Sequence, residues 1–194
     1  AGDEYGDYPT SDAFPTGVTG LFDLLYFNVS ANEYGTTFRF QLANAYDPGW
    51  GAGNFSHPIF GVMIDTGAGG STTAVSDIYA NTLTGWEYGF KIDGWVQDFY
   101  TPATIEDPQN SGHGISVKYE MDDDEHWFTF NVPESFLGSI AQADWLYYVV
   151  VGSGDTNHFR GHNAATEDWR FGGGVDGTVD PNYVDILVPP GGDS

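Results

Sequence analysis

Carboxylate side chains gather near both ends of the sequence, where their spacing suits a bound calcium ion. Three of them occur within the first seven residues, and two more follow a glycine-rich stretch near the end. Calcium in proteins prefers carboxylate and carbonyl oxygens, so we predict a structural calcium site. The predicted ligands are Asp3, Glu4, Asp7, Asp23, Asp176 and Asp180. The alternatives are a solvated acidic terminus and a loop whose Asp side chains bond to their own backbone.

Aromatic side chains are frequent, with 6 Trp and 12 Tyr among 194 residues, and offer a second kind of chemistry. Trp50 lies among Pro48, Gly49 and Gly51, which are turn residues that a core strand would not contain. An exposed aromatic ring can stack on the C–H face of a sugar while nearby Asp, Asn and Gln side chains bond to its hydroxyl groups. We therefore expect Trp50, Trp86 and Trp95 to face a carbohydrate. The alternative for each is packing in the core or beneath a loop.

Motifs that would indicate catalysis are absent from the sequence. It contains neither a Gly-x-Ser-x-Gly elbow nor a His-Glu-x-x-His helix motif, and the lack of cysteine excludes a thiol nucleophile. Pairs of carboxylates are not diagnostic among 28 acidic residues. The sequence thus predicts a non-catalytic protein. One alternative is a haem-b electron-transfer domain with Met63 and a histidine as axial ligands, although a core position also accounts for Met63.

Short β-strands must position these residues, because apolar runs alternate with Gly, Asp, Asn and Pro along the chain. In the run 36–42, the side chains of Phe38 and Phe40 share one face, while Arg39 and Gln41 share the other. A turn at 32–35 would join this run to the run 22–29. Further strands are predicted at 59–64, 87–92, 95–100, 115–121, 127–132, 145–152 and 184–188. This regular spacing favours a single-domain antiparallel β-sandwich.

The predicted sandwich covers residues 1–188, and residues 189–194 are typical of a linker. One short helix is expected within 133–143. The formal net charge of -23 opposes binding to nucleic acid or to anionic lipid. It is compatible with divalent cations, with neutral sugars and with a high-salt medium. No run of 18 apolar residues occurs, so no membrane-spanning helix is predicted.

Several segments resemble one known family. They are the opening residues 1–6, the segment 20–24 (GLFDL), the strand ending at Asp65, the segment 168–174 (DWRFGGG) and the stretch 180–189. Together they are similar to the C-terminal DOMON-like module of glucodextranases and archaeal-type amylopullulanases. The similarity spans nearly the whole chain, and the segment 168–174 with the stretch 180–189 is its most specific part.

The resemblance implies a β-sandwich related to DOMON domains and to family 9 carbohydrate-binding modules. Such modules are secreted, are often attached to polysaccharide-degrading enzymes or to the cell surface, and are not catalytic. It also implies calcium near the acidic N-terminal segment and Asp23. We therefore expect a secreted module that binds carbohydrate or a cell-surface glycan and contains structural calcium. A self-assembling structural or adhesive surface protein is the remaining alternative.

Overall fold

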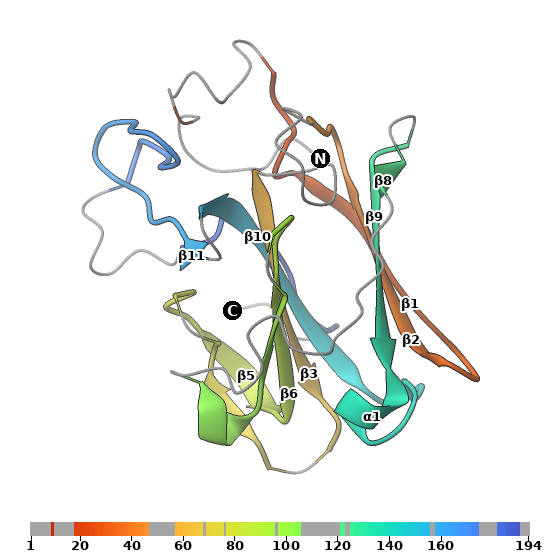
Figure 1. The fold of residues 1–194 in the computed structure, drawn as a ribbon. Helices are drawn as coiled ribbons and strands as arrows, with labels where there is room; N and C mark the ends of the chain where they lie inside the picture. The colour runs from red at the N-terminus through yellow and green to blue at the C-terminus, as the bar shows by residue number, and fades with distance from the viewer. Residues whose placement is uncertain are drawn as a thin grey trace.

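The fold is an antiparallel β-sandwich, as the sequence predicts (Figure 1). The computed structural model describes residues 9, 18–46, 57–67, 69–75, 77–95, 97–105, 121–122, 125–155, 158–174 and 182–190. Every strand pairing among them is antiparallel. Among these residues no helix has the length and apolar character needed to cross a membrane.

The first sheet has the strand order β1-β2-β9-β8. Its strands are β1 (Leu24–Asn32), β2 (Gly35–Leu42), β9 (Trp127–Pro133) and β8 (Met121–Asp122). The predicted turn between β1 and β2 is confirmed: the backbone N–H of Tyr34 donates to Asn32 Oδ1 over 2.8 Å. Gly35 is required there, because a Cβ on it would lie 2.2 Å from the carbonyl oxygen of Val132 in β9. The hairpin therefore packs directly against the end of β9.

The second sheet has six strands in the order β11-β10-β3-β6-β7, with β12 also paired to β10. Its strands are β3 (Pro58–Asp65), β6 (Tyr88–Ile92), β7 (Gln97–Tyr100), β10 (Leu146–Asp155), β11 (His158–Phe159) and β12 (Asp185–Leu187). A separate ribbon pairs β4 (Ser71–Thr73) with β5 (Asn81–Trp86); neither strand was expected from the sequence. The predicted helix is one turn, α1 (Glu134–Leu137), which ends at Gly138 in the left-handed conformation. A 3-10 turn, η1 (Pro102–Thr104), follows β7.

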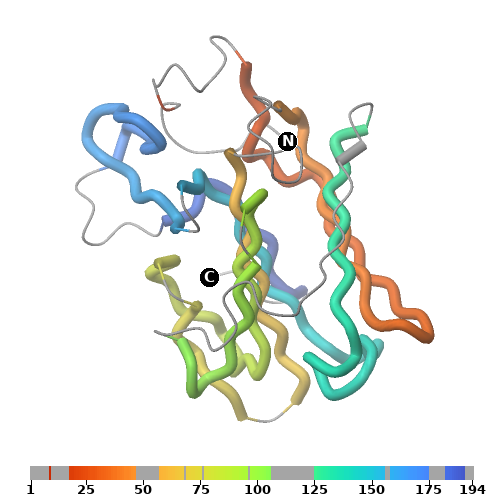
Figure 2. The backbone as a smooth tube through the Cα atoms, in the orientation of Figure 1, coloured from red at the N-terminus to blue at the C-terminus, as the bar shows by residue number. Residues whose placement is uncertain are grey.

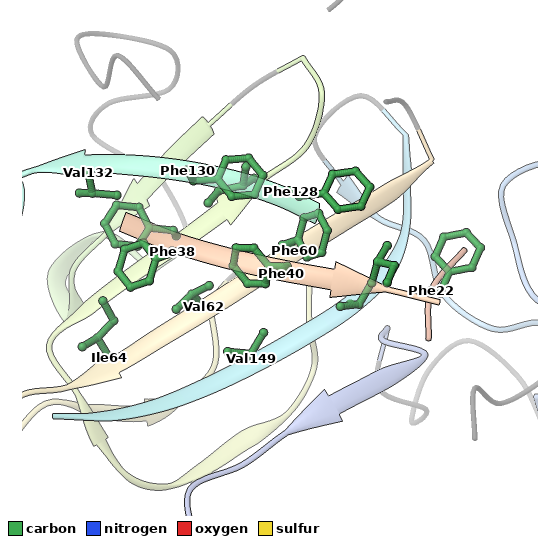
Figure 3. Packing of buried hydrophobic residues seen from close by; sticks show 14 of the residues in the cluster. Phe22, Phe38, Phe40, Phe60, Val62, Ile64, Phe128, Phe130, Val132 and Val149 are labelled. Atoms are coloured by element: carbon green, nitrogen blue, oxygen red, sulfur yellow. The ribbon is translucent and has the colours of Figure 1, made fainter. Parts of the chain in front are cut away.

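The main core lies between the two sheets (Figure 3). Side chains at every second position of β2 and β9 point inward and meet those of β3 and β10. The rings of Phe40 and Phe60 are 4.5 Å apart between centroids, which brings the two sheets into direct contact. Alternate positions of β2, by contrast, are only partly buried. This alternation leaves the other face of the first sheet for polar residues.

A second apolar cluster covers the opposite face of the six-stranded sheet. The segment around Ile78 packs so closely on β3 that a Cβ on Gly61 would lie 2.8 Å from the Ile78 side chain. Trp86 belongs to this cluster with no exposed surface, and its indole N–H donates to the carbonyl oxygen of Thr73 over 2.8 Å. Our expectation that Trp86 faces a sugar is therefore wrong. Because β3 is covered on both faces, all eight of its residues are buried.

Candidate functional site

The outer face of the β1-β2-β9 sheet presents a row of polar and aromatic side chains, which we call the polar strip. It is formed by Tyr26, Asn28 and Ser30 of β1, Thr37, Arg39 and Gln41 of β2, and Trp127, Thr129 and Asn131 of β9. Strand register places these residues in three cross-strand rows. Each strand contributes every second residue because its intervening side chains fill the core. From the first row to the third, the polar strip spans roughly 13 Å along the strands, at ~3.3 Å per residue.

Two aromatic rings form one end of the polar strip. Tyr26 and Trp127 both pair with Gln41, one from each side. Their ring centroids are 6.5 Å apart and their planes differ by 29°. Tyr26 is 62% exposed. The Cζ atom of Arg39 lies 4.3 Å from the centroid of the Trp127 ring, a cation–π contact that fixes the orientation of both side chains.

Hydroxyl and amide groups form the other end of the polar strip. Thr37 Oγ1 donates to Asn131 Oδ1 over 2.6 Å, which fixes the orientation of the Asn131 amide. A hollow of about 330 Å³ opens beside them at the β1-β2 turn. Its lining includes Asn32 and Tyr34, and the Tyr34 side chain is 79% exposed. This end of the polar strip can therefore offer hydrogen bonds next to a second aromatic ring.

The polar strip carries little charge in an acidic protein. None of its nine residues has a carboxylate, whereas the whole chain has 28 acidic residues. Arg39 is its one cation, and it makes no ion pair with any residue that the structure describes. Exposed amides, hydroxyls and aromatic faces without net negative charge suit a neutral polyhydroxy ligand, because such a ligand needs both hydrogen-bond partners and flat apolar contacts.

The tryptophans predicted to face a sugar have different positions in the fold. Trp50 lies outside the described residues, and Trp86 is in the second core cluster. Trp95, in the turn between β6 and β7, is 50% exposed, and its backbone N–H donates to Asp93 Oδ1 over 2.7 Å. The structure instead brings Tyr26 and Trp127 together. The sequence contained a signal for this pair: Tyr26 and Trp127 each stand next to a phenylalanine in a predicted strand. The same alternation places Arg39 and Gln41 on the outer face of β2.

The predicted calcium ligands fall mostly outside the described residues. Five of the six lie there: Asp3, Glu4, Asp7, Asp176 and Asp180. Asp23 is described and is only 3% exposed. The next residue, Leu24, donates its backbone N–H to Asp185 Oδ2 over 2.7 Å, so carboxylates from the start and the end of the chain lie close to the same turn. Within the described ranges, no three His, Cys, Asp or Glu side chains form a group that could hold a metal ion.

Met63, the residue considered for a haem ligand, is 2% exposed and belongs to the second core cluster. It lies opposite Tyr148 and Gly89 in the six-stranded sheet. Met63 therefore lies in a packed, apolar part of the interior, which is the core position that the sequence offered as the alternative to a haem ligand.

A family model described as the C-terminal, SLH-like binding module of glucodextranase matches residues 1–194, the whole chain. No curated protein matches it. The matched family is a binding module and not a catalytic domain.

Proposed function

The chain belongs to the family of C-terminal, SLH-like binding modules of glucodextranase, and we propose that it is a non-catalytic module that binds a neutral carbohydrate through the polar strip. The family supplies the general role, binding without catalysis. The polar strip supports the ligand class, because it combines aromatic rings with fixed amide and hydroxyl groups on one open face.

The geometry of the polar strip favours an extended glycan over a single small molecule. The polar strip extends along three paired strands, from the rings of Tyr26 and Trp127 to the hollow beside Tyr34. A sugar ring stacked on Trp127 would have its hydroxyl groups within the reach of Arg39 and Gln41. Further sugar units would then follow the strand direction toward Asn131.

Structural calcium remains part of the proposal. Asp23 is almost fully buried, and a nearby cation would stabilise the charged form of its carboxylate there. The hydrogen bond from the Leu24 backbone to Asp185 brings a second carboxylate to the same turn. Asp23 would act as one ligand, together with the five acidic residues predicted from the sequence. The ion would link the N-terminal and C-terminal parts of the sandwich and would not contact the sugar.

The location of the protein follows from the same proposal. A module that binds a polysaccharide or a cell-surface glycan works outside the cell, and a high acidic charge keeps such a surface hydrated in salt. We therefore propose a secreted or cell-surface-attached protein.

The proposal is tested by titrating the labelled chain with neutral oligosaccharides while recording backbone amide NMR shifts. The expected shifts are at Tyr26, Arg39 and Trp127 and at their neighbours along the three strands. Tyr26→Ala should weaken binding with little change in thermal unfolding. The matched control is Leu83→Ala, which also truncates an exposed apolar side chain, 58% exposed on β5. Shifts confined to residues outside the β1-β2-β9 sheet would contradict the proposal.

A further inference from the structure

Basic side chains are rare in this chain, and most of them meet at one place. The sequence has five Lys and Arg residues against 28 acidic ones. Arg160 and Arg170 line a pocket of about 250 Å³, and Lys91 contacts Asp77 in the same wall. We call it the arginine pocket; its lining residues are Asp77, Tyr79, His158, Phe159, Arg160, Gly161, Arg170 and Asn182. Two of the five cations therefore line one small cavity, and a third contacts its wall from within the fold.

The wall of the arginine pocket is fixed by hydrogen bonds. Asp77 Oδ2 accepts from Lys91 Nζ over 3.0 Å and contacts His158 Nδ1 at 2.8 Å. Lys91 is only 2% exposed, so its charge is matched by Asp77 within the fold. Asn182 Nδ2 donates to the backbone carbonyl of Asp77 over 2.7 Å. Burial raises the pKa of Asp77, but the bonds to His158 and Lys91 outweigh it and hold that pKa below its usual value.

The two arginines differ in how far their charges are matched. Arg160 Nη2 donates to Asp155 Oδ2 over 2.6 Å, a close ion pair. Among the described residues, the carboxylate that pairs with Arg170 is that of Glu167, whose Oε2 is 4.0 Å from Nε, and both side chains are more than one-third exposed. An exposed contact at that distance is weak. The guanidinium of Arg170 thus keeps donors for a ligand, and its planar shape suits two parallel bonds to a carboxylate.

Tyr79 places an aromatic ring at the same cavity. It lines the arginine pocket and is 70% exposed. Both Tyr79 and Asp77 have positive φ angles, 54° and 70°, in a region that bulky side chains rarely adopt. Such conformations persist only where the surroundings enforce them, and they concentrate at functional sites. The uncommon backbone conformation at Tyr79 therefore presents its exposed ring at the arginine pocket.

We propose that the arginine pocket is a second binding site, which takes the carboxylate group of an acidic sugar on Arg170 and stacks the sugar ring on Tyr79. A net charge of -23 repels anionic ligands from most of the surface. At this cavity Asp77 is balanced by Lys91 and Arg160 by Asp155, whereas the weak contact of Arg170 with Glu167 leaves the Arg170 guanidinium able to attract an anion. An anionic group is therefore attracted here and not to the polar strip.

The second site uses a different surface from the first. Figures 1 and 2 show β11 and the blue segment that follows it on the opposite side of the molecule from the β1-β2 hairpin. The inference takes from the proposed function only the class of ligand, a sugar. The polar strip can therefore fail as a glycan site while the arginine pocket binds, and the reverse holds equally.

The test is a titration of the full chain with sodium glucuronate, glucose, acetate and inorganic phosphate, followed by NMR at the arginine pocket. Glucuronate should shift residues around Tyr79 and Arg170 and bind at least tenfold more tightly than glucose or acetate. Arg170→Gln should lower glucuronate affinity tenfold or more, and Arg170→Lys should lower it less. Ala143→Asp is the matched control, because it makes the same change in net charge at an exposed turn elsewhere.

Tyr79→Ala separates a sugar site from a simple anion site. It should weaken glucuronate binding and leave acetate binding unchanged, since only the sugar has a ring to stack. Equal affinity for glucuronate, phosphate and acetate would overturn the proposal, as would equal losses in Arg170→Gln and Ala143→Asp. Neutral oligosaccharide binding, tracked in the same spectra at Trp127, reports separately on the polar strip. Circular dichroism of each variant confirms that a loss of binding is not a loss of folding.

Discussion

Replacing Trp127 by alanine tests the polar strip most directly. A sugar that covers one face of the indole removes about 60 Å² of apolar surface from water, which is worth ~1.5 kcal/mol at ~25 cal/mol per Å². Since ~1.4 kcal/mol corresponds to a tenfold change in Kd, Trp127→Ala should weaken neutral oligosaccharide binding about tenfold. The variant also loses the contact with Arg39, at a cost of ~0.5–1 kcal/mol in unfolding free energy.

Isothermal titration calorimetry measures the first effect, and thermal unfolding measures the second. For a chain of this size, the stability loss should lower Tm by only a few degrees, so the variant stays folded during the titration. Trp95→Ala is the matched comparison, because it removes the same type of side chain from a 50% exposed position in the β6-β7 turn, away from the polar strip. Unchanged affinity in Trp127→Ala with weakened affinity in Trp95→Ala would refute the polar strip and support the sequence-based choice of Trp95.

Three further predictions concern stability. The pKa of Asp77 is lowered in the folded state, so its contribution to the free energy of unfolding is fully present above the unfolded pKa, near 4, and is lost as the pH falls through the lower folded pKa. Urea midpoints of the protein and of Asp77→Asn should therefore differ at pH 6 and converge in acid. A difference that stays constant with pH would contradict this. Trp86→Ala should cost about 3–5 kcal/mol in urea unfolding, because it empties a fully buried position, and a cost below ~1 kcal/mol would mean that Trp86 is not a core residue. Removing calcium with EDTA should lower the Tm of the unmodified chain and should lower that of Asp23→Asn much less. The control Glu33→Gln, a change at the exposed hairpin turn, should respond like the unmodified chain. An equal EDTA shift in all three proteins would remove Asp23 from the ligand set.

Strand positions were predictable from the sequence because the signal is local. The alternation of Phe38, Arg39, Phe40 and Gln41 sets the two faces of β2, and the turn residues on either side fix its ends. The same logic located β3, β6, β7, β9 and β10 to within a few residues. The strands β4 and β5 were missed, since a glycine-rich stretch and an irregular Thr-rich run carry no clear period of two.

The assignment of Trp86 failed for a physical reason. A sheet in a simple sandwich has one buried face, so an aromatic residue at a strand end can be expected on the surface. Here the segment around Ile78 and the ring of Phe159 cover the outer face of the six-stranded sheet and create a second core. That covering depends on residues more than 70 positions apart in the sequence, and no local pattern reports it. The proximity of Tyr26 and Trp127 likewise depends on strands distant in sequence, because β1 and β9 pair with opposite sides of β2.

Charge explains why the two proposed sites would take different ligands. A background of -23 penalises every anionic ligand, and salt reduces this penalty over distances beyond about 10 Å. The polar strip avoids the penalty by lacking carboxylates, so its contacts favour neutral sugars and do not depend on attraction between charges. The arginine pocket overcomes it locally, because Arg170 can bond directly to an anionic group while Lys91 balances Asp77 from within the fold. A glycan with both neutral and acidic units would then engage opposite sides of the module, and the module could join two chains of one polysaccharide.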